Sequence, residues 1–313
     1  MMQLDRITLG RMAKELGFVR DTLEKVCRLV DILRFFESDD LLADALALKG
    51  GTAINLTLFD LPRLSVDIDL DYCKSIDREA MLADRDAITS KISKYMTANG
   101  YMLSPKSKNY HALDSFVYEY FNCGGVKDNL KIEINYMLRC HVLPVEKRIV
   151  KLPWNDEEVK ALTVAPTEIF ASKTVALLSR SAPRDLYDLH NMIRNGSIGE
   201  DKRELFKKCV VFYSAISTER PPEQFVLDNI GNITKMQIKR DLDPVLRKGE
   251  RFKLEFVREQ VKSFLDDILI STEDERKFWD KFSEGEYMPE LVFTGEAQNL
   301  AKHPMALWKC RHK

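Results

Sequence analysis

The sequence lacks the features that mark several special classes of protein. Its six cysteines are scattered over 313 residues without a Cys-x-x-Cys pair, which fits a reducing cytosol and argues against structural zinc. The first residues, Met-Met-Gln-Leu-Asp-Arg, contain no apolar core of a signal peptide. No apolar run approaches the length of about 18 residues that a membrane span needs. We therefore expect a cytoplasmic protein with no membrane association.

An excess of charge of one sign is also absent. With 48 basic and 49 acidic residues the net charge is -1, so any contact with nucleic acid must come from a local patch. Two basic segments, 235–253 and 302–313, are candidates for such contacts. The apolar content of 45% is ordinary for a globular chain with a real core, and the length fits one large or two modest domains.

The N-terminal part, to about residue 40, has a helical pattern. Gly17 separates a short first piece from a longer one that Asp21 could cap. We interpret the longer piece as a helix that covers a sheet, with a DNA-reading helix-turn-helix as the alternative. Its core-facing stripe comprises Leu23, Val26, Val30 and Leu33.

The remaining pattern places a sheet before a helical half. We predict a helix over 77–98 that ends at Asn99-Gly100. Pro153–Asp156 marks a boundary, and the sheet should end near residue 160. The predicted strands cover 101–104, 111–120, 131–136 and 141–151, with a hairpin turn over 122–125, and the predicted helices cover 167–180, 184–195, 200–215, 223–230, 232–247, 254–270 and 273–283.

One stretch carries most of the chemical information. The apolar run 45–48 leads into Gly50-Gly51, and a short helical segment then ends at Leu61-Pro62. Backbone N–H groups that two glycines leave accessible at a helix start can hold phosphate. The next segment alternates as a half-buried strand does. Its two faces carry Ser65, Asp67, Asp69 and Asp71 on one side and Val66, Ile68 and Leu70 on the other.

These acids have the spacing of a metal site. Asp67 and Asp69 lie about 6.6 Å apart along a strand, so they can converge on one divalent ion or bridge two. Glu133, between Ile132 and Ile134, is a lone acid on a strand with an apolar opposite face. Three such carboxylates can hold two ions about 3.5–4 Å apart, which is what two-metal nucleotidyl transfer needs.

These segments resemble the h-G-G/S … D-h-D … h-E/D-h pattern of the polymerase-β-type nucleotidyltransferases. A wider string, over residues 20–270, resembles the AbiEii-like nucleotidyltransferase toxins. That string comprises Lys49-Gly50-Gly51-Thr52-Ala53, Arg63-x-Ser65-x-Asp67-x-Asp69, Lys173-x-x-Ala176-Leu177-x-x-Arg180 and Arg184-Asp185-Leu186-Tyr187-Asp188-Leu189.

The resemblance implies a fold and two domains. We expect an α+β fold with a polymerase-β-like mixed sheet flanked by helices and a helical C-terminal half. The nucleotidyltransferase domain, with its N-terminal helices, should cover 1–160. A helical domain over 161–313 should close the active-site cleft.

The resemblance also implies roles for residues. Asp67 and Asp69 would bind two Mg²⁺ ions, with Glu133 as a looser third acid. The nucleoside triphosphate would be seated by Gly50, Gly51 and Thr52, and Lys173 and Asp185 would complete the catalytic set.

Each assignment has a structural alternative. Lys173 lies within an apolar helical stripe and needs a partner, which triphosphate could be. Asp185 follows Pro183, where an acid favours the helix dipole in any case, and Asp188 is placed to pair with Arg184. Arg63 would hold phosphate or be a surface charge. Ser65 would donate to a phosphate oxygen or be a plain strand hydroxyl.

The function implied is that of a growth-arresting toxin in a bacterial toxin–antitoxin or phage-defence (abortive infection) pair. It would transfer a nucleoside monophosphate from NTP to an acceptor hydroxyl, with the 3′ end of tRNA as the expected acceptor. A neighbouring, AbiEi-like antitoxin would be its partner. Two alternatives stay open: an antibiotic-type enzyme with a small-molecule acceptor, and a non-catalytic scaffold of the same fold.

Overall fold

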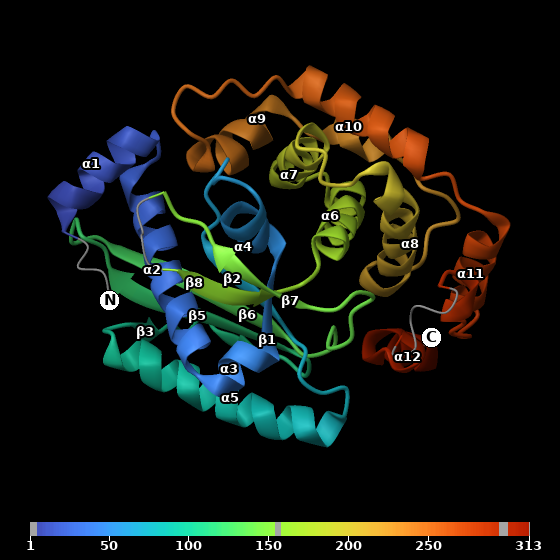
Figure 1. Cartoon of the computed structure of the whole chain (residues 1–313), viewed down its shortest axis with the longest axis horizontal. Helices are drawn as coiled ribbons and strands as arrows, with labels where there is room; N and C mark the ends of the chain where they lie inside the picture. The colour runs from blue at the N-terminus through green and yellow to red at the C-terminus, as the bar shows by residue number, and fades with distance from the viewer. Residues whose placement is uncertain (1–4, 154–157, 294–299, 313) are drawn as a thin grey trace. The chain divides into compact units, whose positions relative to one another are not determined.

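A computed structural model describes residues 5–153, 158–293 and 300–312 (Figure 1). The chain divides into two compact units. The first comprises Met1–Arg139, Val145–Val164 and Pro244–Glu250, and the second comprises Cys140–Pro144, Ala165–Asp243 and Arg251–Lys313. Residues 154–156 of the predicted boundary and Lys313 of the basic tail lie outside the described residues.

The first unit is built on an eight-stranded mixed sheet. Its strand order is β3-β5-β6-β2-β1-β8-β7, and β4 also pairs with β5. The strands are β1 Leu46–Lys49, β2 Asp67–Tyr72, β3 Met102–Leu103, β4 Lys108–Asn109, β5 Leu113–Phe121, β6 Lys127–Asn135, β7 Glu146–Val150 and β8 Val159–Thr163. The acidic strand β2 is central, antiparallel to β1 and parallel to β6.

Helices cover one face of this sheet. Contacts join α2 to β8, α3 to β1 and α5 to β3 (Figure 1). Alternate residues of the central strands, such as Ile68 and Ile132, are buried toward these helices. The helical segments of the unit are α1 Arg6–Leu16, α2 Arg20–Ser38, α3 Asp40–Ala45, α4 Gly50–Ala53, the π-helix η1 Ile54–Leu58 and α5 Arg78–Ala98.

The N-terminal prediction is confirmed with one correction. Gly17 ends α1 in the left-handed conformation with φ 75°, and all four residues of the predicted stripe on α2 are buried. The prediction that Asp21 caps α2 was wrong, because the helix begins at Arg20 and places Asp21 in its first turn. Val19 is the N-cap residue and makes no side-chain capping bond.

The second unit is helical. Its segments are α6 Pro166–Arg180, α7 Pro183–Arg194, α8 Glu200–Ser217, η2 Asp228–Asn232, α9 Lys235–Gln237, η3 Ile238–Leu242, α10 Leu254–Ile268, α11 Glu273–Ser283, η5 Pro289–Leu291, η6 Leu300–Lys302 and α12 Pro304–Arg311; η4 Asp243–Val245 leads back into the first unit. Within the described ranges, no helix is long and apolar enough to cross a membrane.

Several predicted elements differ in extent. The strand predicted over 141–151 is confined to β7, and two short strands, β4 and β8, were not predicted. The sheet therefore reaches Thr163, beyond its predicted end near residue 160. β8 was missed because its alternation of buried and exposed side chains covers only five residues. The helices predicted over 223–230 and 232–247 are short 3-10, α and π turns, and Pro244 interrupts the second of these ranges.

Candidate active site

The Gly50-Gly51 turn joins β1 to α4 and lies directly against the acidic strand. Gly50 has φ +66°, a conformation that favours glycine. A Cβ atom at Gly50 would lie 2.7 Å from Oδ2 of Asp69, and one at Gly51 would lie 2.5 Å from Nη2 of Arg63. Both glycines therefore pack closely against side-chain ends, and they lie next to the Asp69 carboxylate.

Buried polar side chains hold this turn in place. Asn55 donates from Nδ2 to the Gly51 carbonyl over 2.7 Å. The Thr52 hydroxyl, fully buried, lies 2.5 Å from the Asp67 carbonyl and 3.0 Å from Oγ of Ser65. Asn55 was not among the predicted site residues, although its position four residues after Gly51 on a helix is a usable signal.

We expect Gly50→Ala to damage the site more than the fold. The left-handed backbone should lower the free energy of unfolding by about 1–2 kcal/mol. The added methyl group must also displace the Asp69 carboxylate. Nucleotidyl transfer should therefore fall at least tenfold, measured as kcat on folded protein.

Gly100→Ala is the matched control for that variant. Gly100 has a similar φ of +77°, but a Cβ atom there meets nothing within 4 Å. It should lose comparable stability and keep its transfer rate. Equal activity losses in the two variants would contradict a specific role for the Gly50–Asp69 contact.

The three predicted metal ligands share one face of the sheet. Asp67 and Asp69 on β2 are half-buried, while Ile68 and Leu70 between them are 1% exposed on the opposite face. Asp69 pairs in register with Glu133 of the parallel strand β6. Side chains directly opposite one another project to the same face, so Glu133 joins the two aspartates.

A lysine of β6 accompanies these acids. Nζ of Lys131 lies 2.9 Å from Oε2 of Glu133, and Lys131 pairs in register with Asp67. Although desolvation opposes the shift, the hydrogen bond to Glu133 and the charges of Asp67 and Asp69 raise the pKa of the Lys131 ammonium. The acids thus create a negative potential that already attracts a cation.

The donor set suits a hard divalent ion. Half-buried carboxylates on one face are the ligands that Mg²⁺ prefers. In the described parts of the chain, however, no three His, Cys, Asp or Glu side chains are gathered as a ready metal cluster. The ligands would therefore come from the Asp67–Asp69 pair first, with Glu133 exchanging its lysine partner for the ion.

The third aspartate of β2 has a different environment. Asp71 is 3% exposed, and its Oδ1 lies 2.5 Å from Nζ of Lys49 on β1. This ion pair neutralises one acid of the strand inside the sheet. The negative charge at the more accessible end of β2 is thereby concentrated on Asp67 and Asp69.

Arg63 and Ser65 lie beneath the glycine turn. Arg63 is 1% exposed, so the prediction of a surface charge is wrong. Its Nη1 donates to the Leu64 carbonyl over 2.9 Å, and Leu64 N–H donates to the Val245 carbonyl. The returning segment Pro244–Glu250 thus covers this arginine, and the positive charge is buried beside Gly51.

The second unit contains a compact ion network at the start of α7. Nζ of Lys173 on α6 lies 2.8 Å from Asp185 and 2.9 Å from Asp188. Arg180 also pairs with Asp185, over 2.7 Å. Both carboxylates are essentially buried, and the Lys173 side chain is 11% exposed. Two aspartates thus supply a partner for Lys173 within its own unit. The triphosphate as its partner stays a prediction.

A known nucleotidyltransferase toxin has the same fold as this chain. A search of curated proteins found no match to its sequence. Among solved structures, MenT4, a nucleotidyltransferase toxin from Mycobacterium tuberculosis H37Rv, shares the fold at a TM-score of 0.62, with 18% identity over 97% of this chain and 99% of that one. An Escherichia coli CdnC:HORMA-deltaN complex matches at 15% identity over 95% and 99% of the two chains, but its TM-score of 0.26 is too low to indicate a shared fold.

The family assignment comes from a sequence match over most of the chain. The model of the nucleotidyl transferase AbiEii toxin family, type IV toxin–antitoxin system, matches residues 32–284. This range includes the glycine turn, the acidic strand, Glu133 and the Lys173 network. The chain therefore belongs to the AbiEii family of nucleotidyltransferase toxins.

Proposed function

We propose that this nucleotidyltransferase transfers a nucleoside monophosphate from NTP to a hydroxyl of RNA, with Mg²⁺ bound by Asp67 and Asp69. The observation that supports the proposal is the shared face of Asp67, Asp69 and Glu133 beside the Gly50 turn. Bound there, Mg²⁺ would neutralise triphosphate charge and polarise the reacting oxygens. Family membership supports the NTP as donor.

The residues of the chain have distinct roles in this proposal. Backbone N–H groups of Gly50 and Gly51 donate to phosphate oxygens, and the buried Arg63 adds a positive potential beneath them. Glu133 accepts the proton of the attacking hydroxyl. The acceptor oxygen bonds to the α-phosphorus as the bond to pyrophosphate breaks. Lys173 and Asp185 remain predicted members of the catalytic set.

The acceptor that we propose is the 3′ end of tRNA. This end carries an accessible hydroxyl on a short single strand, which suits an enzyme that modifies a terminal ribose. Membership in a toxin–antitoxin family implies an antitoxin partner. We propose that it is AbiEi-like and encoded nearby, and its co-expression should restore growth that this chain arrests.

The function can be tested by labelling. Purified protein should be incubated with each of the four NTPs, labelled at the α-phosphate, and with tRNA, tRNA-free RNA or a panel of small hydroxyl compounds. We expect label on tRNA from at least one NTP, complete loss with EDTA, and recovery on addition of Mg²⁺. Label only on a small compound would contradict the RNA acceptor, and transfer that survives EDTA would contradict the metal.

A further inference from the structure

The face of the sheet that carries the acids continues toward the β5–β6 hairpin. Along β6, the residues on the Glu133 side alternate through Lys131, Asn129 and Lys127. On β5, Val117 pairs with Lys131 and Phe121 pairs with Lys127, so these two share that face. We call this surface the hairpin strip, and it comprises Val117, Glu119, Phe121, Lys127, Asn129 and Lys131.

The strip is accessible, whereas the opposite face of the same strands is core. Phe121 is 64% exposed, and the Lys127 side chain is 56% exposed. Their neighbours on the other face, Tyr118, Tyr120 and Leu130, are no more than 3% exposed. An aromatic ring held in solvent on a sheet face is available for stacking by a base.

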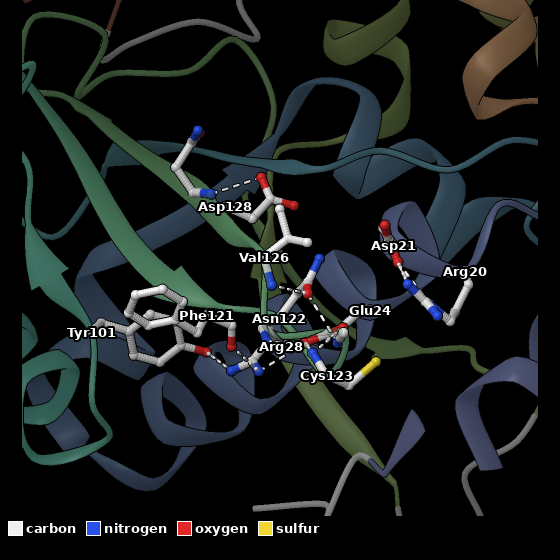
Figure 2. A network of polar contacts seen from close by, with 12 residues as sticks. Arg20, Asp21, Glu24, Arg28, Tyr101, Phe121, Asn122, Cys123, Val126 and Asp128 are labelled. Atoms are coloured by element: carbon white, nitrogen blue, oxygen red, sulfur yellow. Dashed lines mark hydrogen bonds and ion pairs between the residues drawn. The ribbon is translucent and has the colours of Figure 1, made fainter. Parts of the chain in front are cut away.

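The hairpin end is fixed by the buried network drawn in Figure 2. Glu24 of α2, with no exposure, accepts a hydrogen bond from the Cys123 N–H over 2.9 Å. Arg28 pairs with Glu24 over 2.8 Å and donates to the Phe121 carbonyl over 3.4 Å. Asn122 Oδ1 accepts from the N–H groups of both Gly124 and Val126. Phe121 is therefore presented by an anchored turn.

The strip presents two lysines, and each of them pairs with an acid on the same face. Lys127 pairs with Glu119 over 2.7 Å, and Lys131 pairs with Glu133. Phosphate groups can replace these partners, and metal binding by Glu133 would release Lys131. From Glu133 to Lys127 the strand spans about 20 Å, the length of several nucleotides. Lysines interleaved with an exposed aromatic ring are typical of single-strand binding surfaces.

We propose that the hairpin strip binds the single-stranded 3′ end of the acceptor RNA. A base stacks on Phe121, backbone phosphates contact Lys127 and Lys131, and the terminal hydroxyl reaches Asp67 and Asp69. This inference rests on the proposed function, because it assigns the acceptor surface of that same site. Strand register supports RNA over a protein partner, since the strip leads directly into the acids.

The test compares Phe121→Ala and Lys127→Glu with two controls outside the strip. Phe256→Ala removes another exposed aromatic ring, 52% exposed on α10. Lys94→Glu reverses another exposed lysine, on α5, a helix that packs on the sheet.

Two readouts separate this inference from the proposed function. We expect each strip variant to raise KM for tRNA at least tenfold, with KM for NTP unchanged, as loss of one stacking contact predicts. Fluorescence anisotropy with end-labelled tRNA should show the same loss of affinity, and Lys127→Glu should weaken its salt dependence.

Strip variants that bind and modify tRNA like the two controls would overturn the inference, even when the wild-type enzyme labels tRNA. Loss of antitoxin affinity without loss of RNA affinity would overturn it in favour of a protein surface. Failure of the wild type to label any RNA would instead count against the proposed function, and the binding assay would still decide the role of the strip.

Discussion

Asp69→Asn should reduce kcat for nucleotidyl transfer about a thousandfold, equivalent to about 4 kcal/mol of transition-state stabilisation. The amide keeps the shape of the side chain but removes the charge that would hold Mg²⁺ beside Glu133. Asp67→Asn should have a similar effect. Stability should change little or rise, because neutralising one of several clustered carboxylates relieves repulsion.

The control for this experiment lies on the same strand. Asp71→Asn breaks the buried pair with Lys49 and should lower the melting temperature. Its transfer rate at a temperature where it is folded should stay within a few fold of wild type. Equal kcat in wild type and Asp69→Asn would exclude the acidic face as the metal site.

Lys173→Met should lower the free energy of unfolding by about 3–5 kcal/mol, because it leaves two buried carboxylates with only part of their counter-charge. Asp185 and Asp188 are 0% and 1% exposed, so water cannot replace the ammonium. Denaturant unfolding would measure the loss. Transfer should also fall at least a hundredfold at temperatures where the variant is folded, if Lys173 acts in the reaction.

Two further variants separate stability from catalysis. Lys173→Met/Asp188→Leu removes one charge of each sign and should recover much of the stability but none of the activity. Lys207→Met removes another nearly buried lysine of the second unit, which lies 3.3 Å from Glu275. It should destabilise the chain and spare kcat. Full activity in the stable double variant would show that the Lys173 network is purely structural.

The local part of the site was predictable from the sequence. Period-two alternation placed Asp67 and Asp69 opposite Ile68, and two glycines before a helical segment marked the turn. The register of Asp69 with Glu133 was not predictable, because the two residues are 64 positions apart (133 − 69) and nothing local encodes the pairing. Lys131 was missed for the same reason, since its partner is identified only by the neighbouring strand.

Burial was the least predictable property. Arg63 follows Pro62 and has the sequence character of a surface residue, yet the returning segment 244–250 covers it. This segment lies about 180 residues later in the chain, so the sequence around Arg63 gives no indication that it will be covered. For Lys173, the surrounding apolar stripe correctly indicated the need for a partner. The identity of that partner depended on how α7 packs against α6.

The pairing of the acidic strand has a consequence for how the toxin is made. β2 is flanked by β1, which precedes it, and by β6, which is synthesised much later, and β1 in turn pairs with β8. A ribosome must therefore pass residue 135 before the strands on both sides of Asp67 and Asp69 can assemble, and residue 163 before β8 can pair with β1. A nascent or prematurely terminated chain that ends before β6 contains the acids but not the sheet that aligns them. The active site can therefore form only after β6 has been synthesised.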